Sequence, residues 1–151
     1  MTDLISRTAL VTGASRGIGR ATARALARAG ARIFVHYGNS AKDADSLVAE
    51  IREAGGRADA VGADLSAPDG LAAEIGKLVV GQLDILVANA GIAVPATIEA
   101  QTVEDFDRMF AVNVRAPFFL VQQLLPLMKD GSSIVMTSSL AARAAVGQLA
   151  A

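Results

Sequence analysis

Short apolar runs and stretches with helical spacing alternate along the whole chain. The apolar runs are bounded by glycine or polar residues and are short enough to form buried strands. On this basis we expect strands over residues 9–11, 32–36, 58–63, 83–88 and 133–137.

Between these runs, apolar residues recur every three or four positions, which is the period of an amphipathic helix. We expect helices over residues 21–29, 44–51 and 66–79, which end at Gly30, at Gly55-Gly56 and at Gly81. Each of these glycines marks the stop, because glycine is favoured just past the end of a helix.

A longer helix should begin at Thr102. Thr102 and Asp105 have the spacing of a capping box, in which side chains satisfy the free N–H groups of the first turn. Apolar residues then continue at helical spacing through Phe118. Pro117 and Pro126 should bend or interrupt this helix, because proline lacks the N–H that an inner turn needs.

This alternation is typical of a parallel sheet covered by helices on both faces. The chain has 151 residues, which fits one domain with its own core. It is 52% hydrophobic and 19% charged, a composition that suits a sheet buried on both faces. We therefore predict a single α/β domain over residues 1–151, built on a doubly wound parallel sheet.

Composition also excludes several classes of function. Lys and Arg number 14 against 15 Asp and Glu, so no basic field favours nucleic acid or an anionic membrane. The absence of cysteine excludes disulfides and thiolate chemistry, and the single histidine, His36, cannot anchor a histidine metal cluster. Residues 1–7 have no apolar core of a signal peptide, and no apolar run is expected to span a membrane, so a cytoplasmic location is the default.

The chemistry is concentrated in the glycine-rich stretch between the first strand and the first helix. Residues 12–19 read Thr-Gly-Ala-Ser-Arg-Gly-Ile-Gly. A helix start offers free N–H groups and partial positive charge, and glycines let the backbone approach a pyrophosphate. The spacing differs from the standard dinucleotide fingerprint, so a glycine turn without a ligand is the alternative.

This stretch resembles the cofactor loop of the classical short-chain dehydrogenase/reductase family, in members similar to 3-oxoacyl-acyl-carrier-protein reductase. The resemblance covers residues 8–139 and implies a Rossmann-like dinucleotide-binding domain. It assigns cofactor binding in this loop to Gly13, Ser15, Arg16, Gly17, Ile18 and Gly19.

The residues after the second strand bear on the choice of cofactor. An NAD-selective site usually places an acidic residue there for the ribose, but this chain has Tyr37, which we expect at the cofactor ribose, followed by Asn39 and Ser40. Without a carboxylate to repel it, the extra phosphate of NADP could be held by Arg16, Asn39 and Ser40. We therefore expect NADP rather than NAD; the alternative is an ordinary loop without preference.

Two further strand ends carry polar residues that the resemblance assigns to the cofactor. Asp64 and Leu65, after the third strand, would meet the adenine, although Asp64 could equally be a turn residue that starts a helix. Asn89, Ala90 and Gly91, after the fourth strand, would line the nicotinamide ribose, and a structural role for Asn89 is at least as plausible. Ala88 departs from the family's usual Asn-Asn-Ala-Gly.

The resemblance also names two catalytic residues. Asn113, inside the long helix, would order a water in a proton relay; the alternative is an amide that pairs with backbone. Ser139, after the fifth strand, would orient the substrate carbonyl as a hydrogen-bond donor. The substrate would be a small-molecule carbonyl or alcohol, and a homodimer or homotetramer would form through the long helix around Asn113.

The family's proton donor is a tyrosine about thirteen residues beyond the serine, followed by a lysine four residues later. Counted from Ser139, that tyrosine falls at position 152, one residue past Ala151, and the only tyrosine present is Tyr37. Two hypotheses follow. The sequence is a fragment of an NADP(H)-dependent oxidoreductase that lacks the Tyr/Lys segment and the last strands of the fold, or it is a non-catalytic NADP-binding module.

Overall fold

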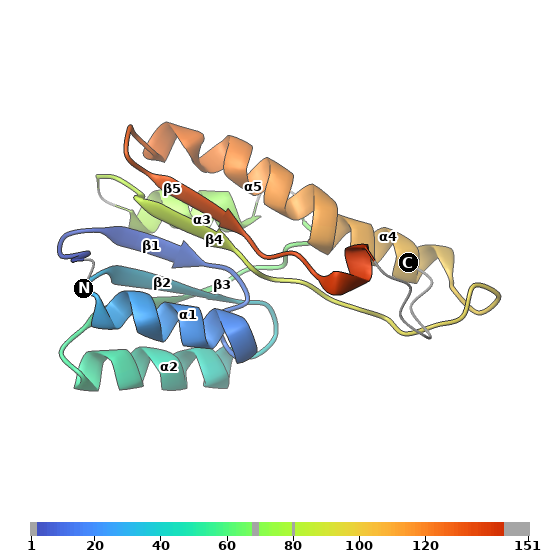
Figure 1. Ribbon diagram of the computed structural model, residues 1–151, viewed down its shortest axis with the longest axis horizontal. Helices are drawn as coiled ribbons and strands as arrows, with labels where there is room; N and C mark the ends of the chain where they lie inside the picture. The colour runs from blue at the N-terminus through green and yellow to red at the C-terminus, as the bar shows by residue number, and fades with distance from the viewer. Residues whose placement is uncertain (1–2, 68–69, 80, 144–151) are drawn as a thin grey trace.

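The protein is described by a computed structural model that places residues 3–67, 70–79 and 81–143 (Figure 1). All strands of its sheet run parallel, in the order β3-β2-β1-β4-β5. The strands are β1 (Thr8–Val11), β2 (Arg32–Tyr37), β3 (Arg57–Gly62), β4 (Ile85–Ala88) and β5 (Ser133–Met136). The chain order reverses beside β1, so β1 and β4 form the switch point of a doubly wound sheet, as the sequence predicts.

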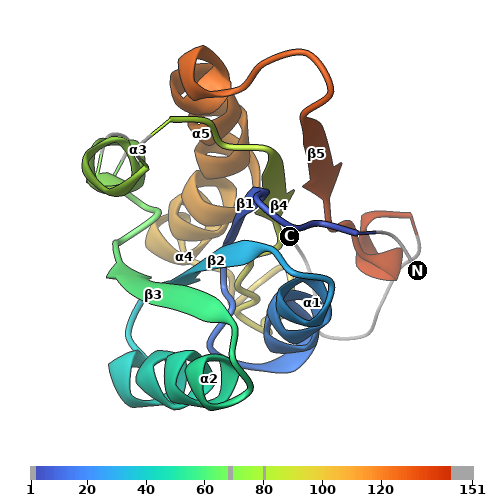
Figure 2. The same ribbon diagram turned by 90° about the vertical axis from the view of Figure 1, so that its left-hand side faces the viewer.

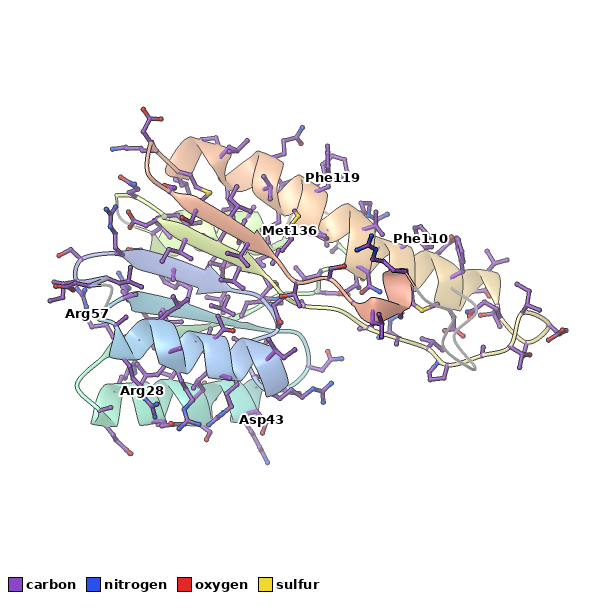
Figure 3. All side chains as sticks on the ribbon, viewed as in Figure 1. Arg28, Asp43, Arg57, Phe110, Phe119 and Met136 are labelled. Atoms are coloured by element: carbon purple, nitrogen blue, oxygen red, sulfur yellow. The ribbon has the colours of Figure 1, made fainter. Side chains whose placement is uncertain are left out.

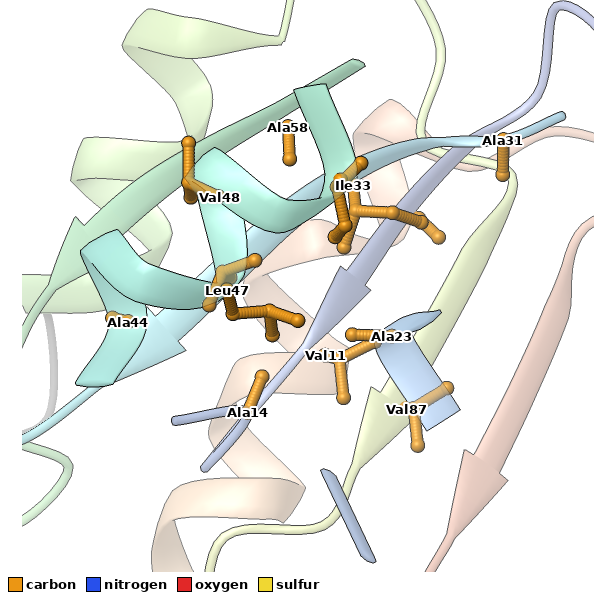
Figure 4. Close-up of a cluster of buried hydrophobic side chains, with 13 residues drawn as sticks. Val11, Ala14, Ala23, Ala31, Ile33, Ala44, Leu47, Val48, Ala58 and Val87 are labelled. Atoms are coloured by element: carbon orange, nitrogen blue, oxygen red, sulfur yellow. The ribbon is translucent and has the colours of Figure 1, made fainter. Parts of the chain in front are cut away.

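Helices cover both faces of this sheet (Figure 2). Helices α1 (Gly17–Arg28) and α2 (Ala41–Glu53) lie on one face, and α3 (Gly70–Leu78), α4 (Val103–Phe110) and α5 (Ala116–Leu124) lie on the other. The two faces bury different sides of the same strands, because neighbouring side chains of a strand point in opposite directions. Val11, Ile33 and Val35 pack under α1 and α2 (Figure 4), whereas Leu10 and Phe34 pack under α3 and α5.

Helix α1 begins at Gly17, four residues before the predicted start at residue 21. The reason is that the chain turns tightly at Gly13, where φ is +62°, so the turn is complete by Arg16. The Arg20 N–H then donates to the Arg16 carbonyl (3.2 Å), the first bond of the helix. The glycines of the loop therefore form the first helical turn, with its free N–H groups directed beyond the sheet.

The long helix runs from Val103 to Leu127 and changes type three times, from α to π, back to α and then to 3-10. Thr102 caps it as predicted, because its hydroxyl oxygen accepts from the Asp105 N–H (3.1 Å). A π-helical turn over Ala111–Arg115 ends two residues before Pro117, and a 3-10 turn over Leu125–Leu127 (η2) contains Pro126. The prolines therefore change the helical hydrogen-bond pattern without breaking the helix.

By length and composition alone, Val103–Leu127 is long and apolar enough to cross a membrane. Within the fold, one face of the helix packs against the rest of the domain through Met109, Val112, Leu120 and Leu124. Only 22% of its most apolar window is buried, because the opposite face carries exposed aromatic residues.

Large apolar side chains are exposed on that face of the helix and on strand β5. Phe110 and Phe119 project from the outer side of the long helix, and Met136 lies on β5 at the rim of the sheet (Figure 3). Every residue of β5 is exposed, and its Ile134, Val135 and Met136 are between 41% and 56% exposed. Within the described chain, β5 has a strand neighbour on one side only, so its other edge is free.

Candidate functional site

A cavity of about 580 Å³ lies at the carboxyl ends of β1, β2, β3 and β4. In Figure 1 this is the end of the sheet toward which the strand arrows point and past which the long helix extends. All predicted cofactor residues except Gly19 and Tyr37 line it. They are Gly13, Ser15, Arg16, Gly17, Ile18, Asn39, Ser40, Asp64, Leu65, Asn89, Ala90 and Gly91.

The glycine loop forms the floor of the cavity by close backbone packing. A Cβ on Gly13 would lie 2.9 Å from the Ala90 Cα, and a Cβ on Gly19 would lie 2.3 Å from the Gly13 carbonyl oxygen and 2.6 Å from the Asn89 side chain. Side chains at either position would displace backbone. Gly19 therefore acts in packing helix α1 against the loop, which leaves the N–H groups of its first turn accessible to an anion.

Thr12 and Asn89 join the ends of β1 and β4. The Thr12 hydroxyl oxygen accepts from the N–H groups of Asn89 and Ala90, both at 2.9 Å, and the Asn89 side-chain amide donates to the Thr12 carbonyl (3.0 Å). The Asn89 side-chain oxygen also accepts from the Thr137 hydroxyl (3.4 Å). Asn89 thus has a structural role, which the sequence left open, because it joins the ends of β1 and β4. It also lines the cavity.

The loop after β2 divides into a cavity side and a packing side. Asn39 and Ser40 line the cavity together with Arg16. Tyr37 does not, because its ring lies over Gly62 on β3, where a Cβ would come within 2.8 Å of the tyrosine hydroxyl, and it packs on the hydrophobic cluster under α1 and α2. The side chains that this loop contributes to the cavity, Asn39 and Ser40, are thus neutral, and the cation that lines the cavity with them is Arg16.

Asp64 and Arg108 both line the cavity. The Asp64 carboxylate accepts from the Ser66 N–H (2.8 Å). Hydrogen bonds from Ser66 chiefly lower the pKa of Asp64, and the positive charge of Arg108 lowers it further. Asp64 is therefore a turn-forming carboxylate that stays ionised, exposed at the rim where the adenine was expected.

A smaller cavity of about 150 Å³ adjoins the first and contains the predicted catalytic region. Asn113, Thr137 and Ser138 line it with apolar residues of α5 and β5. The Asn113 side chain is held by the backbone of Ile92, to which it donates (2.8 Å) and from which it accepts (2.9 Å). The Ser139 hydroxyl oxygen accepts from the Ala141 N–H (3.2 Å) and caps the short 3-10 turn η3 (Leu140–Ala142), so Ser138 rather than Ser139 borders the cavity.

Comparison with known proteins identifies the family to which this arrangement belongs. The sequence matches the short chain dehydrogenase family over residues 7–151. The chain is a member of that family. Among its curated relatives, the hydroxynaphthalene reductase-like protein Arp2 of Metarhizium brunneum is 41% identical over 146 residues, or 93% of this chain and 53% of the relative. The trihydroxynaphthalene reductase of Colletotrichum orbiculare is 36% identical over 144 residues, or 94% and 51%.

Solved structures of short chain dehydrogenases share the fold. The angucycline C-6 ketoreductase LanV with bound NADP is 46% identical, with a TM-score of 0.90, over 97% of this chain and 60% of the other. A short chain dehydrogenase from Burkholderia cenocepacia in complex with NADP is 39% identical, with a TM-score of 0.91, over 96% and 60%. The present chain spans about half the length of the curated short chain dehydrogenases that it matches.

Sequence reasoning missed several residues of this short chain dehydrogenase cleft. His36, Gly38, Ala63, Ile92, Arg108 and Val112 line the cavity without having been predicted. Arg108 lies about one and a half turns before Asn113 on the same helix. This spacing could have indicated that Arg108 lies near the site. His36 was considered only as a metal ligand, and its ring lies at the cavity although it is only 2% exposed.

Proposed function

We propose that the full-length protein is an NADP(H)-dependent oxidoreductase that interconverts a carbonyl and a secondary alcohol by hydride transfer. The observation that carries this proposal is the 580 Å³ cavity, which gathers the glycine loop and the polar residues after β2, β3 and β4 into one cleft. The cleft belongs to a chain of the short chain dehydrogenase family, and two structures similar to it hold NADP.

The glycine loop fits the pyrophosphate of a dinucleotide. Gly13 and Gly19 allow the tight packing of this loop, since a Cβ at either would collide with neighbouring backbone, and the first turn of α1 supplies N–H donors and the positive end of the helix dipole. Asp64 and Leu65 would border the adenine, and Asn89, Ala90 and Gly91 the nicotinamide ribose. Arg16, Asn39 and Ser40 would hold the 2′-phosphate, since this side of the cleft has a cation and no carboxylate.

When bound, NADPH supplies the hydride that reaches the carbonyl carbon. We assign Ser139 to hold the carbonyl oxygen as a hydrogen-bond donor. Asn113 would hold the long helix and the loop after β4 in place and help to order water beside the reacting oxygen. Pro117 has no N–H to donate to the Asn113 carbonyl in α-helical geometry, so that carbonyl oxygen is available to a water. A tyrosine and a lysine beyond Ala151 would complete the proton transfer.

We also propose that the long helix forms the subunit interface of a homodimer or homotetramer. Its exposed face carries Phe106, Phe110, Val114 and Phe118, between 41% and 63% exposed, around a groove of about 590 Å³. Stacked rings at Phe106 and Phe110, 4.4 Å apart, present a flat apolar surface. Sedimentation of the full-length protein should show a dimer or tetramer, and Phe110→Glu should shift it toward the monomer.

A non-catalytic NADP-binding module is the second candidate. It is favoured by the engagement of the Ser139 hydroxyl with the Ala141 N–H, which turns that oxygen away from the cavity that Asn113 lines. In this case the cleft would bind NADPH without turnover, and Ser139 would only cap a turn.

Turnover by the full-length protein and by a polypeptide ending at Ala151 separates the two candidates. NADPH oxidation would be followed with a carbonyl panel that includes substrates of the hydroxynaphthalene and versicolorin reductases to which this chain is similar. The oxidoreductase proposal predicts clear turnover by the full-length protein. For the 151-residue polypeptide it predicts turnover near background. Ser139→Ala should abolish turnover and leave NADPH affinity intact, whereas Ser138→Ala is the matched control with smaller loss. NADPH binding without turnover by the full-length protein on any panel member would favour the module.

A further inference from the structure

His36 lies where three loops of the cofactor cleft meet. Its ring is almost completely buried, at 2% exposure, yet it borders the 580 Å³ cavity. The Gly13 N–H donates to its Nδ1 (3.1 Å), and its Nε2 lies 3.0 Å from the Ala63 carbonyl oxygen. The His36 backbone carbonyl also accepts from the Ala14 N–H (2.9 Å). One residue of β2 therefore holds the glycine loop and the chain leaving β3.

These partners determine the protonation of the ring. A backbone N–H can only donate, so Nδ1 must carry a lone pair, and a carbonyl can only accept, so Nε2 must carry the proton. The neutral Nε2–H tautomer satisfies both contacts at once. Protonation would place an Nδ1–H against the Gly13 N–H, and the two donors would have to separate.

The contact with Gly13 is made at a tightly packed point of the glycine loop. Gly13 has φ of +62° and packs against Ala90 so closely that no Cβ fits. Because Ala90 confines Gly13, a separation of Gly13 from His36 would disturb the loop and shift residues 15–17, which border the cavity. On the other side of the ring, Ala63 directly precedes Asp64 and Leu65. The ring therefore sets the distance between the two loops that would hold the opposite ends of the adenosine part of the cofactor.

We infer that His36 is a positioning residue for cofactor binding, and that it acts only in its neutral form, so that cofactor affinity falls when His36 is protonated. This inference rests on the proposed function, because it takes NADPH as the ligand of the cleft. It adds a residue that neither the glycine motif nor the polar strand ends contain.

The surroundings of the ring favour the neutral form. Burial is the main cause that lowers the pKa of His36, and the hydrogen bond to Ala63 partly opposes it. Among the charged groups that border the same cavity, Arg16 from the glycine loop and Arg108 from α4 oppose protonation, and Asp64 favours it. Tyr37, the next residue on the strand, points to the other face of the sheet. The helix dipole of α1 adds positive potential on the side of Gly13.

Two substitutions of His36 separate the two hydrogen bonds of the ring, because each keeps one bond and removes the other. In His36→Asn, the side-chain oxygen takes the place of Nδ1 and keeps the acceptor for Gly13, but the donor to Ala63 is lost. In His36→Gln, the amide reaches toward the place of Nε2 and keeps the donor to Ala63, but the acceptor for Gly13 is lost. Neither side chain titrates, so both variants remove the proton equilibrium while each keeps one contact.

The test is the dissociation constant of NADPH for the full-length protein and both variants between about pH 5 and pH 8. At the upper end, His36→Gln should bind about tenfold more weakly than the wild type, because the buried Gly13 N–H loses its acceptor, and His36→Asn should bind more tightly than His36→Gln. Toward acid pH, the wild type should lose affinity relative to His36→Asn, by at most about tenfold per pH unit, as one proton is involved. The 2′-phosphate titrates near pH 6 itself, but it does so equally with both proteins.

A second measurement uses the wild-type protein alone and therefore does not depend on whether a variant folds. Nitrogen-15 spectra of the wild-type imidazole should show the Nε2–H tautomer and a pKa that falls further when NADPH saturates the site, because linkage is reciprocal. Parallel affinity curves for the wild type and His36→Asn, or a His36 pKa that NADPH leaves unchanged, would overturn the inference and leave the proposed function standing. No binding of NADPH to the wild type at any pH would overturn both.

Discussion

The side chain of Asn113 and the backbone of Ile92 form a closed pair of hydrogen bonds. The Asn113 amide nitrogen donates to the Ile92 carbonyl (2.8 Å), and its oxygen accepts from the Ile92 N–H (2.9 Å). The pair ties the π-helical turn of the long helix to the loop that follows β4. The pair is exposed, and the side chain keeps a second N–H and a second lone pair that can bind water.

Replacing Asn113 should disturb the loop after β4 before it disturbs the fold. Asn113→Ala leaves the Ile92 N–H and carbonyl without these partners, and Asn113→Asp can accept from the N–H but repels the carbonyl. Because the pair is exposed to water, we expect a loss of about 1 kcal/mol or less in the free energy of unfolding for Asn113→Ala. The larger effect should be on kcat of the full-length enzyme. An unchanged kcat in both variants would contradict a role for Asn113 in the site.

Arg16 should set the preference for NADPH over NADH. Its side chain borders the cavity beside Asn39 and Ser40, so Arg16→Ala should weaken NADPH about tenfold, as expected for a charge-assisted bond, and leave NADH nearly unchanged. Arg28→Ala, an exposed arginine near the other end of α1, is the matched control. Calorimetric titration with both dinucleotides measures the effect. Equal losses for the two dinucleotides would show that Arg16 is structural.

Gly19 should tolerate no side chain. The Cβ of Gly19→Ala would lie 2.3 Å from the Gly13 carbonyl oxygen, so backbone must move, at a cost of about 1–3 kcal/mol in the free energy of unfolding. Gly76→Ala is the control, because Gly76 lies on the exposed side of α3 with no atom within 4 Å of a new Cβ. Alanine there should stabilise the protein by about 0.5–1 kcal/mol. Chemical denaturation of both variants provides the measurement, and equal stability of the two would refute the packing role of Gly19.

Stability should also respond to pH through His36. The pKa of His36 is lowered in the folded protein, so below the ordinary value of 6.5 the unfolded chain binds a proton that the folded chain does not. The contribution of neutral His36 is therefore fully present above pH 6.5 and is lost progressively as the pH falls toward the folded pKa. Melting curves should show a smaller acid loss for His36→Asn than for the wild type. A steeper acid loss in the variant would reverse the sign of this argument.

The free edge of β5 should promote self-association of a polypeptide that ends at Ala151. Ile134, Val135 and Met136 are exposed there, and an apolar unpaired edge is a template for pairing with another chain. Val135→Lys should suppress this association, and it should destabilise the full-length protein if further strands cover the edge. Ile98→Lys, at a loop residue that is 74% exposed, is the control. A monodisperse, cooperatively melting 151-residue monomer would contradict the prediction.

The strands and their parallel, doubly wound sheet could be predicted from the sequence because the relevant signals are local. Apolar runs such as 32–36 mark strands, and the glycines of residues 13–19 mark the turn that fixes the cofactor end. The start of α1 was predicted late, since Gly17 and Gly19 read as loop residues although their small size is what lets the helix begin there. Periodicity could not show that the long helix would take a π turn before Pro117.

The sequence predicted which residues of the candidate site follow the ends of strands. It did not predict in which direction the side chains of those residues point. Tyr37 was placed at the ribose from its position, yet its ring turns to the opposite face and covers Gly62. Ser139 follows β5 as expected, but its hydroxyl caps the next turn. Arg108 and His36 reach the cavity from a helix and from inside a strand, and only tertiary packing brings them to it.

Titration of NADPH into the full-length protein tests the central claim most directly, because every role assigned here depends on a dinucleotide in the 580 Å³ cleft. We predict saturable binding of one NADPH per chain, weaker binding of NADH, and loss of binding in Gly13→Ala, whose Cβ would meet the Ala90 backbone at 2.9 Å. The control Gly76→Ala should bind as the wild type does. Absence of saturable NADPH binding by the folded full-length protein, or equal binding by Gly13→Ala, would contradict the account.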